Sequence, residues 1–298
     1  MDKLHGTDVT AGVEAAQSAE LPAQQWGPVA LVGAGPGDPE LLTVKAMKRL
    51  QTAEVVLHDN LISEDILALV PEHAVLVNVG KRCGDPKDRG LQQQEIHDLM
   101  LIHSQRGRRV VRLKAGDPLV FGRGGEELEF LAQHGISAEV VPGITTALGA
   151  AASQLMPLTH RGSATHVRFV VGQSKSRALP DLSWTDLAKD VAGQTVVFYM
   201  GMKKIDAICQ RLLDEGAAAD TPMAVVESAT LPSERIAHGT IESLPKMAKA
   251  LEFGSGGPVI IFLGPTAAFP ARLESLAGKG TLKRPRAPSS DDGIQSMA

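Results

Sequence analysis

The sequence has few aromatic residues, few cysteines and little net charge, and each shortage excludes a class of protein. Aromatic side chains make up 3% of the 298 residues, too few for the base-stacking platforms of proteins that bind single-stranded nucleic acid. A net charge of -4 does not suggest the strongly basic face of other nucleic-acid-binding proteins. The two cysteines, Cys83 and Cys209, lack the spacing of a disulfide scaffold or a zinc site. We therefore expect no nucleic-acid partner and no metal.

Long apolar runs are also absent. No run reaches the roughly 18 residues of a membrane-spanning helix, because the nearest candidate, Val140–Leu158, is interrupted by Pro142, Gly143 and Pro157. The first residues, Met1 to Val9, carry charged side chains and are not followed by the apolar core of a secretory signal. The sequence thus predicts a cytoplasmic protein without a membrane partner.

The two terminal arms show no clear hydrophobic period. Between them, short apolar runs alternate with helical patterns, and this alternation is typical of α/β proteins. The clearest helical patterns lie at Leu41–Leu50, Glu95–Ser104, Glu126–Gln133 and Lys203–Glu215. Ten strands are expected, at Val29–Gly33, Glu54–His58, Ala74–Val79, Arg109–Lys114, Ala138–Val141, His166–Gly172, Thr195–Met200, Met223–Ser228, Arg235–Thr240 and Val259–Leu263.

Ten strands divide naturally into two sheets of about five, with the division near Pro142-Gly143. We expect a flexible N-terminal arm at residues 1–27, an N-terminal α/β subdomain at 28–143, a C-terminal α/β subdomain at 144–278 and a disordered tail at 279–298. The sheets should be mostly parallel, with some antiparallel pairing in the second half, where the strand Arg235–Thr240 closely follows another.

A glycine-rich loop, Gly33–Gly37, follows the first strand and precedes Asp38-Pro39, a good start for a helix. With Asp59 about twenty residues later, it resembles a dinucleotide-binding fingerprint, so a nicotinamide-dependent oxidoreductase is one alternative. Pro36 removes an amide donor, and Asp38 would repel a pyrophosphate at the helix N-terminus. The loop therefore favours a small ligand without phosphate. A glycine turn with a helix cap and no ligand is the other alternative.

Arg112 and Lys114 lie on one face of an expected strand, opposite Val111 and Leu113. On a solvated edge strand they need no partner. Interior strands of a parallel sheet are covered on both faces, however, and there the two cations would require partners.

Seven segments together resemble the tetrapyrrole methylase family, and within it the branch that methylates uroporphyrinogen III. They occur in the family's order between residues 28 and 265. The first glycine loop and the segment 141–145 are shared with other branches of the family, whereas 121–127, 157–161 and 197–201 together resemble the uroporphyrinogen branch. The segments are 32–39 (VGAGPGDP), 79–82 (VGKR), 112–118 (RLKAGDP), 121–127 (FGRGGEE), 141–145 (VPGIT), 157–161 (PLTHR) and 197–201 (VFYMG).

The resemblance implies two α/β subdomains with a ligand cleft between them, usually in a homodimer. It also implies S-adenosylmethionine (SAM) as cofactor and S-adenosylhomocysteine as its product. The implied reaction adds two methyl groups, at C2 and C7, to uroporphyrinogen III to give precorrin-2. The implied SAM-binding residues are Pro36, Ala115, Gly116, Asp117, Val120, Thr145, Thr146, Met200 and Ala229. Ala115 and Ala229 depart from the family, which commonly has glycine there, and each adds a methyl group near the cofactor.

Four residues are expected to carry the chemistry. The resemblance assigns Asp59 as proton acceptor and Lys81 as proton donor, although a turn residue and a solvated strand end are the alternatives. Arginine suits the acetate and propionate groups of the substrate, so Arg123 and Arg161 are expected to bind it, with Arg123 close enough to assist the proton step. Glu126 is expected to orient Arg123 or a pyrrole N–H, or else to be an ordinary first-turn acid.

Three rival functions remain at this point. A relative acting on a later corrinoid intermediate, or on a protein or RNA, would bind SAM but leave uroporphyrinogen III unmethylated. A nicotinamide-dependent oxidoreductase would bind NAD, and a non-enzymatic module would bind SAM without turnover. Because only a short arm precedes residue 28, the chain is expected to stop at the dimethylated product. The sequence does not identify whether that product serves sirohaem, cobalamin or haem d1.

Overall fold

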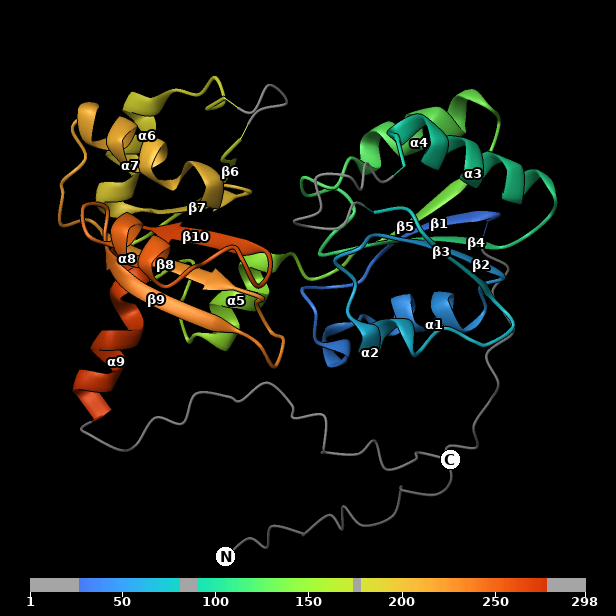
Figure 1. The fold of residues 1–298 in the computed structure, drawn as a ribbon, viewed down its shortest axis with the longest axis horizontal. Coiled ribbons are helices and arrows are strands. Elements are labelled where there is room, and N and C mark those ends of the chain that lie inside the picture. Colours follow the sequence, from blue (N-terminus) through green and yellow to red (C-terminus); the bar gives the residue numbers. More distant parts are fainter. Residues whose placement is uncertain (1–26, 81–90, 174–177, 278–298) are drawn as a thin grey trace, which may run out of the picture.

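The chain forms two lobes that lie side by side, each built on a five-stranded sheet (Figure 1). The structure, a computed structural model, describes residues 27–80, 91–173 and 178–277. The predicted tail at 279–298, and the predicted arm at 1–27 apart from its last residue, lie outside the described residues. Among the described residues, no helix combines the length and apolar character needed to cross a membrane.

The first sheet has the strand order β3-β2-β4-β1-β5, and every pair in it is parallel. The strands and helices of this lobe are β1 (Val29–Gly33), the 3-10 helix η1 (Pro39–Leu41), α1 (Val44–Gln51), β2 (Val55–His58), α2 (Glu64–Leu67), β3 (Val75–Asn78), α3 (Gln93–Gln105), β4 (Val110–Lys114), α4 (Gly124–Gln133) and β5 (Ala138–Val141).

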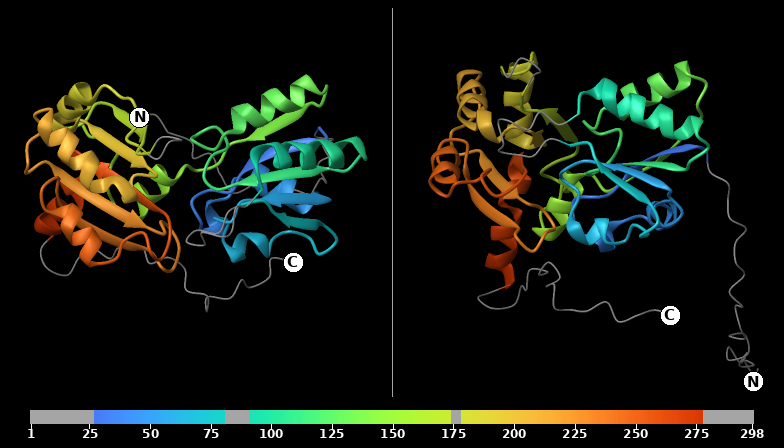
Figure 2. Two further views of the ribbon diagram at one scale, coloured as in Figure 1. Left: turned by 45° about the horizontal axis from the view of Figure 1, so that its top comes forward. Right: turned by 45° about the vertical axis from the view of Figure 1, so that its right-hand side comes forward.

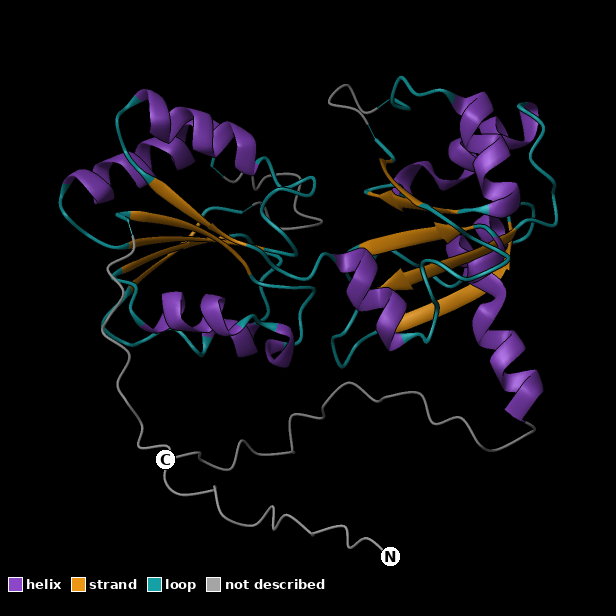
Figure 3. Cartoon of the chain, turned by 180° about the vertical axis from the view of Figure 1, so that it is seen from behind, coloured by secondary structure: helices purple, strands orange, loops and turns teal. Residues whose placement is uncertain are grey.

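Helices cover both faces of this sheet, α1 and α2 on one side and α3 and α4 on the other (Figures 1 and 3). Successive residues of a strand point to opposite faces, so β1 contributes Ala30 and Val32 to the core beneath α1 and Val29 and Leu31 to the core beneath α3 and α4. All five residues of β4 are buried. This double burial explains why β1 is a continuous apolar run, and it makes Arg112 and Lys114 of β4 interior residues.

The second sheet has the order β6-β7-β10-β8-β9 and is mixed. Its elements are α5 (Thr146–Ser153), β6 (Val167–Val171), α6 (Trp184–Gly193), β7 (Thr195–Tyr199), η2 (Met202–Lys204), α7 (Ile205–Asp214), β8 (Pro222–Glu227), β9 (Arg235–Thr240), α8 (Leu244–Ala250), β10 (Val259–Leu263), η3 (Pro265–Ala268) and α9 (Phe269–Ala277). Figure 2 shows this lobe from two further directions.

The prediction of two α/β units with mostly parallel strands is confirmed, and so is the antiparallel pairing expected in the second half, which is more extensive there than predicted. Only β6 and β7 pair in parallel there, and the other three pairs are antiparallel. The segment between β8 and β9 is too short for a crossover helix, so these two strands form a hairpin. β10 then enters between β7 and β8 and runs opposite to both. Among the residues that the structure describes, five of the eight strand pairs are parallel.

The predicted helix Leu41–Leu50 is two elements instead of one. Asp38 accepts a hydrogen bond from the Glu40 amide at 2.8 Å and caps η1, as the Asp38-Pro39 pair predicts. Thr43 then accepts from the Ala46 amide at 3.1 Å and starts α1. Because a second cap sits inside the expected helix, the chain turns there and the long helix begins at Val44.

One buried carboxylate fastens the loop that joins α8 to β10. Glu227, at the end of β8, is 2% exposed and pairs with Arg235 of β9 at 2.5 Å. Its other oxygen accepts the amides of Gly254 at 2.7 Å and Gly256 at 3.2 Å. Burial raises the pKa of Glu227, but the hydrogen bonds from Arg235 and these amides outweigh burial, and the net shift is downward.

We expect Glu227→Gln to lower the free energy of unfolding by about 1–3 kcal/mol at neutral pH, because the amide group cannot satisfy both Arg235 and the loop. A lowered folded-state pKa stabilises the fold fully above the unfolded value of 4.5 and less as pH falls through the folded value. The difference between the two proteins in urea unfolding should therefore shrink below pH 4.5. Glu242→Gln, at an exposed position, is the control and should change little. A pH-independent difference would contradict this role.

Candidate functional site

An open groove lies between the two lobes. Its walls come from the segment before α4 and the first turns of α4 in the first lobe, and from the ends of β6 and β7 in the second. The residues that line it are Leu119, Phe121, Arg123, Gly124, Gly125, Glu126, Glu129, Val171 and Met200. Three residues predicted for the site, Arg123, Glu126 and Met200, are therefore brought together here, and the predicted cleft between subdomains is present.

Unusual backbone conformations concentrate around this groove. Among the described residues, seven other than glycine have a positive φ, a conformation that costs on the order of 1 kcal/mol or more for residues with a side chain. Phe121, Arg123 and Met200, with φ of 53°, 60° and 55°, all line the groove. Ser228 and Thr230 flank Ala229. Strain held at such positions is typical of functional sites.

Arg123 and Glu126 form a two-point pair at the N-terminus of α4. Arg123 donates from Nε to Glu126 Oε1 at 2.9 Å and from Nη2 to Oε2 at 2.6 Å. Both side chains are about half exposed, at 48% each. Glu126 is therefore in contact with Arg123, as its predicted role in orienting that residue requires. An exposed pair three residues apart contributes only about 0.2–0.5 kcal/mol, so another carboxylate can replace Glu126 at small cost.

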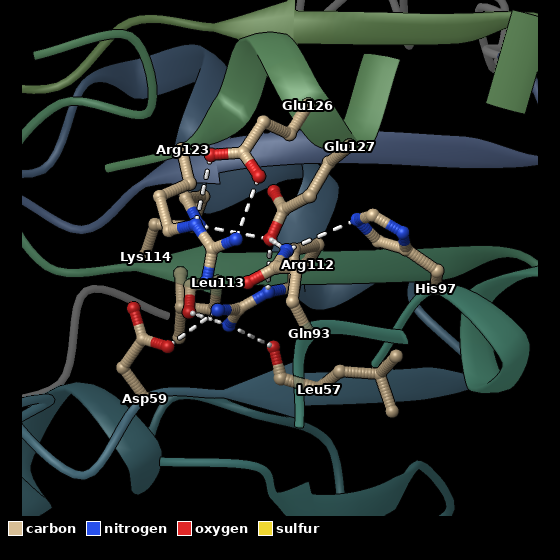
Figure 4. Close-up of polar contacts among 10 residues, drawn as sticks. All are labelled: Leu57, Asp59, Gln93, His97, Arg112, Leu113, Lys114, Arg123, Glu126 and Glu127. Carbon is tan, nitrogen blue, oxygen red and sulfur yellow. Dashed lines mark hydrogen bonds and ion pairs between the residues drawn. The ribbon is translucent and has the colours of Figure 1, made fainter. Parts of the chain in front are cut away.

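A charged cluster lies beside this pair, where β2 and β4 end (Figure 4). We call Asp59, Arg112, Lys114 and Glu127 the charge cluster. Glu127 of α4 is fully buried and accepts from Arg112 Nε at 3.2 Å and from Lys114 Nζ at 3.0 Å. Arg112 also pairs through Nη2 with Asp59. The two cations of β4 thus have the partners that an interior strand requires.

Glu127 is a site residue that the sequence did not single out. The pattern marked Arg112 and Lys114 as cations in need of partners, but Glu126 and Glu127 are adjacent acids and only the helix rotation separates their roles. In the structure Glu126 turns to the groove and Glu127 turns inward (Figure 4). Burial, and then the neighbouring Arg112, lower the pKa of Lys114, while Glu127 opposes that shift.

Three glycines bring the ends of β1, β4 and β5 into backbone contact. A methyl group on Gly33 would lie 2.5 Å from the Gly143 nitrogen, and one on Gly143 would lie 2.2 Å from the Gly116 carbonyl oxygen. Gly35 and Gly116 exchange backbone hydrogen bonds at 3.2 and 2.8 Å. Asp117 accepts from the Gly143 amide at 3.0 Å and from the Leu119 amide at 2.8 Å. Asp117 therefore holds these loops together.

Tyr199, which the sequence analysis did not select, anchors the predicted residues Thr145 and Thr146. Its hydroxyl shares a hydrogen bond of 2.6 Å with Thr145 Oγ1 and accepts the Ala147 amide at 3.1 Å. Tyr199 thus satisfies the N-terminus of α5, where the Thr145 side chain makes no cap. Burial raises the pKa of Tyr199, which keeps the phenol neutral. Its ring also lies 4.9 Å from the ring of Phe121 in the groove.

The loop around Ala229 meets the glycine loop of the other lobe. Thr230 Oγ1 accepts a hydrogen bond from the Asp38 amide at 3.1 Å. A methyl group added to Gly149 of α5 would lie 2.5 Å from Pro36 Cγ, so the two segments are in close contact. Glu234 secures the loop by accepting the Thr230 amide at 2.5 Å. Neither Ala115 nor Ala229 has a positive φ, so alanine causes no backbone strain at either position.

The predicted site residues thus fall into three groups, one of them being Asp59 in the charge cluster, with Arg161 and Lys81 as exceptions. Those predicted for SAM lie mainly around the glycine contacts and α5, whereas Met200 lies in the groove with Arg123 and Glu126.

Arg161 is exposed and does not line the groove. Its neighbour His160 lies 5.2 Å, ring to ring, from Phe269 of α9. Lys81 lies outside the described residues. Val120 follows Asp117 in a turn, its amide 3.3 Å from the Asp117 carbonyl oxygen. In the described ranges, no group of three or more metal-binding side chains is present.

Comparison with known proteins places these features in a family. The profile of the tetrapyrrole (corrin/porphyrin) methylases matches residues 28–245. The chain is 48% identical over 241 residues to siroheme synthase 3 of Aeromonas hydrophila and 43% identical over 238 residues to siroheme synthase of Thiobacillus denitrificans. These matches cover 81% and 80% of this chain but 49% and 48% of the relatives. The chain therefore spans about half the length of the curated relatives it matches.

Two solved structures are similar along nearly their whole length. Uroporphyrin-III C-methyltransferase from Thermus thermophilus, in complex with S-adenosylhomocysteine, has a TM-score of 0.67 and 40% identity, over 82% of this chain and 100% of that one. A cobalt precorrin-4 methyltransferase of cobalamin biosynthesis has a TM-score of 0.71 and 29% identity, over 80% and 95%. With a profile that matches most of the sequence and relatives well above 30% identity, the chain belongs to the tetrapyrrole methylase family.

Proposed function

We propose that the protein is a SAM-dependent C-methyltransferase that adds two methyl groups, at C2 and C7, to uroporphyrinogen III and so forms precorrin-2. The observation that carries this proposal is the 40% identity to a uroporphyrin-III C-methyltransferase across the whole of that chain. The groove with its exposed arginine, and the strained residues around it, support the same reaction.

The loops around the glycine contacts fit a compact cofactor such as SAM. Gly35 and Gly116 have φ of 73° and 70° and present backbone in place of side chains. A methyl group on Gly116 would be 3.7 Å from Thr145 Cα, an ordinary contact, so the space there is not filled. Asp38 leaves no anion site at the start of η1 because its own carboxylate caps the Glu40 amide. These features favour a ligand without phosphate over a dinucleotide.

SAM would supply an activated methyl group, and the residues proposed to hold it are those named from the family resemblance. The contribution of the chain is to orient the macrocycle, exclude water and accept a proton. Methyl transfer to a ring carbon is aided when the pyrrole N–H loses its proton, and Asp59 is the proposed acceptor. Lys81 is the proposed proton donor. Placement of the reacting carbon in line accounts for much of the acceleration.

Binding of the substrate is proposed to exchange one carboxylate for another at Arg123. Arg123 pairs with Glu126, and a propionate or acetate group of the macrocycle would take the place of Glu126. After this exchange Glu126 is proposed to accept a pyrrole N–H. Arg161 is proposed to hold a second carboxylate of the same substrate.

The chain is further proposed to act as a homodimer in the cytoplasm. Val75 and Leu76 are each 45% exposed on the edge strand β3, and a second copy of the chain paired with this edge would cover these apolar side chains. Cys209 is a buried free thiol, in keeping with a reducing compartment. Sedimentation equilibrium should give twice the mass of one chain, and a single-chain mass at micromolar concentration would contradict the dimer.

Turnover with purified protein tests the proposed reaction. Anaerobic incubation with uroporphyrinogen III and SAM should yield a macrocycle with two added methyl groups, identified by mass spectrometry. S-adenosylhomocysteine should raise the melting temperature, whereas NAD should not. Binding of SAM without methylation of uroporphyrinogen III would overturn the proposal, and methylation of a later corrinoid intermediate in its place would identify the alternative.

Arg123→Lys tests the proposed carboxylate contact. Lysine keeps the charge but loses the two-point geometry, so KM for uroporphyrinogen III should rise roughly 10-fold or more, the effect of losing about 1.5–3 kcal/mol. The affinity for S-adenosylhomocysteine, measured by calorimetry, should stay the same. Arg272→Lys, on the exposed side of α9, is the matched control. An unchanged KM in Arg123→Lys would remove this residue from the binding site.

A further inference from the structure

The charge cluster contains more than stability requires. Arg112 and Lys114 are each 3% exposed and Glu127 is fully buried. Removing such ions from water costs several kcal/mol each. Replacing a buried ion network by apolar residues of similar size is often neutral or stabilising. Packing of β4 against α4 therefore does not by itself explain these three side chains, and their remaining contact leads to Asp59.

Every nitrogen of the Arg112 guanidinium is engaged. Nε donates to Glu127 at 3.2 Å. Nη1 donates to the carbonyl oxygen of Leu57 at 3.2 Å and to that of Leu113 at 3.1 Å. Nη2 donates to Asp59 Oδ1. Because the group is planar and held from β2, β4 and α4 together, its orientation is fixed, and so is the position of the Asp59 oxygen bonded to it.

Asp59 is held on one side only. Its amide lies 3.3 Å from the Leu113 carbonyl oxygen, and its side chain is 28% exposed. Oδ1 is bonded to Arg112, whereas Oδ2 has no hydrogen-bond partner among the residues that the structure describes. A carboxylate with one oxygen anchored and the other accessible is suited to accept a proton from a ligand in a fixed direction.

Glu127 fixes Arg112 from the opposite side. Its Oε1 accepts from Arg112, from Lys114 and from Gln93 Nε2, the last at 3.3 Å. Gln93 in turn lies 3.1 Å from the ring of His97 (Figure 4). The cluster contains two cations and two carboxylates, so its formal charges balance.

We propose that Arg112 is a positioning residue for Asp59, and that Glu127 acts through Arg112 to hold the accessible oxygen of Asp59 toward the substrate. This inference rests on the proposed C-methylation with Asp59 as proton acceptor. Lys114 offers a matched control, because it shares the strand, the face, the burial and the Glu127 partner of Arg112 but donates no hydrogen bond to Asp59.

A double-mutant cycle tests the positioning role. Arg112→Lys should lower kcat roughly 10- to 100-fold, since small misplacements of a reacting group cost rate on this scale. KM for uroporphyrinogen III and the affinity for S-adenosylhomocysteine should change by less than about threefold. In an Asp59→Asn background, Arg112→Lys should have little further effect on kcat, because its target is already absent. Lys114→Met should lower kcat less, and its effect should be the same in both backgrounds.

Glu127→Gln keeps the shape of the side chain and provides a second route if Arg112→Lys does not fold. It should lower kcat without changing KM, and this loss should also disappear in the Asp59→Asn background. Equal losses with and without Asp59, for both variants, would overturn the positioning role while leaving the proposed reaction intact. Absence of turnover by the unaltered protein would overturn both proposals.

Discussion

The site depends on two positive charges buried on the central strand of the first sheet. Arg112 and Lys114 lie where a parallel sheet is covered on both faces, and the fully buried Glu127 pairs with both. The arrangement ties α4 to β4, and therefore fixes where α4 begins. Arg123 and Glu126 lie at the N-terminus of α4. The geometry of the groove between the lobes therefore depends on an interaction in the interior.

Much of the fold could be predicted because its signals are local. Apolar runs marked the strands, and Asp38 and Pro39 marked the start of a helical turn. The orientation of β10 could not be predicted in the same way, because an antiparallel strand inserted between β7 and β8 has the same apolar sequence as a parallel one. The break before α1 was missed because Thr43 caps a helix inside a stretch whose hydrophobic pattern is that of one continuous helix.

The candidate site was predictable where a motif names a residue and unpredictable where it depends on side-chain direction. Arg112 and Lys114 could be recognised as cations in need of partners, but Glu127 could not be separated from Glu126 without the helix in place. Tyr199 was missed because its hydroxyl acts on the N-terminus of a helix more than 50 residues away in sequence. The positive φ of Phe121, Arg123 and Met200 could not be predicted, because these residue types rarely adopt that backbone conformation.

The described chain passes from one sheet to the other only once, between β5 and α5. All strand pairs of the first sheet lie within residues 29–141, and all those of the second within 167–263. During synthesis the leading lobe can therefore close its hydrogen-bond ladder, and neutralise its interior ions, before the trailing lobe has left the ribosome. The wall of the groove that bears Arg123 is then already formed when Met200 arrives to complete the opposite wall.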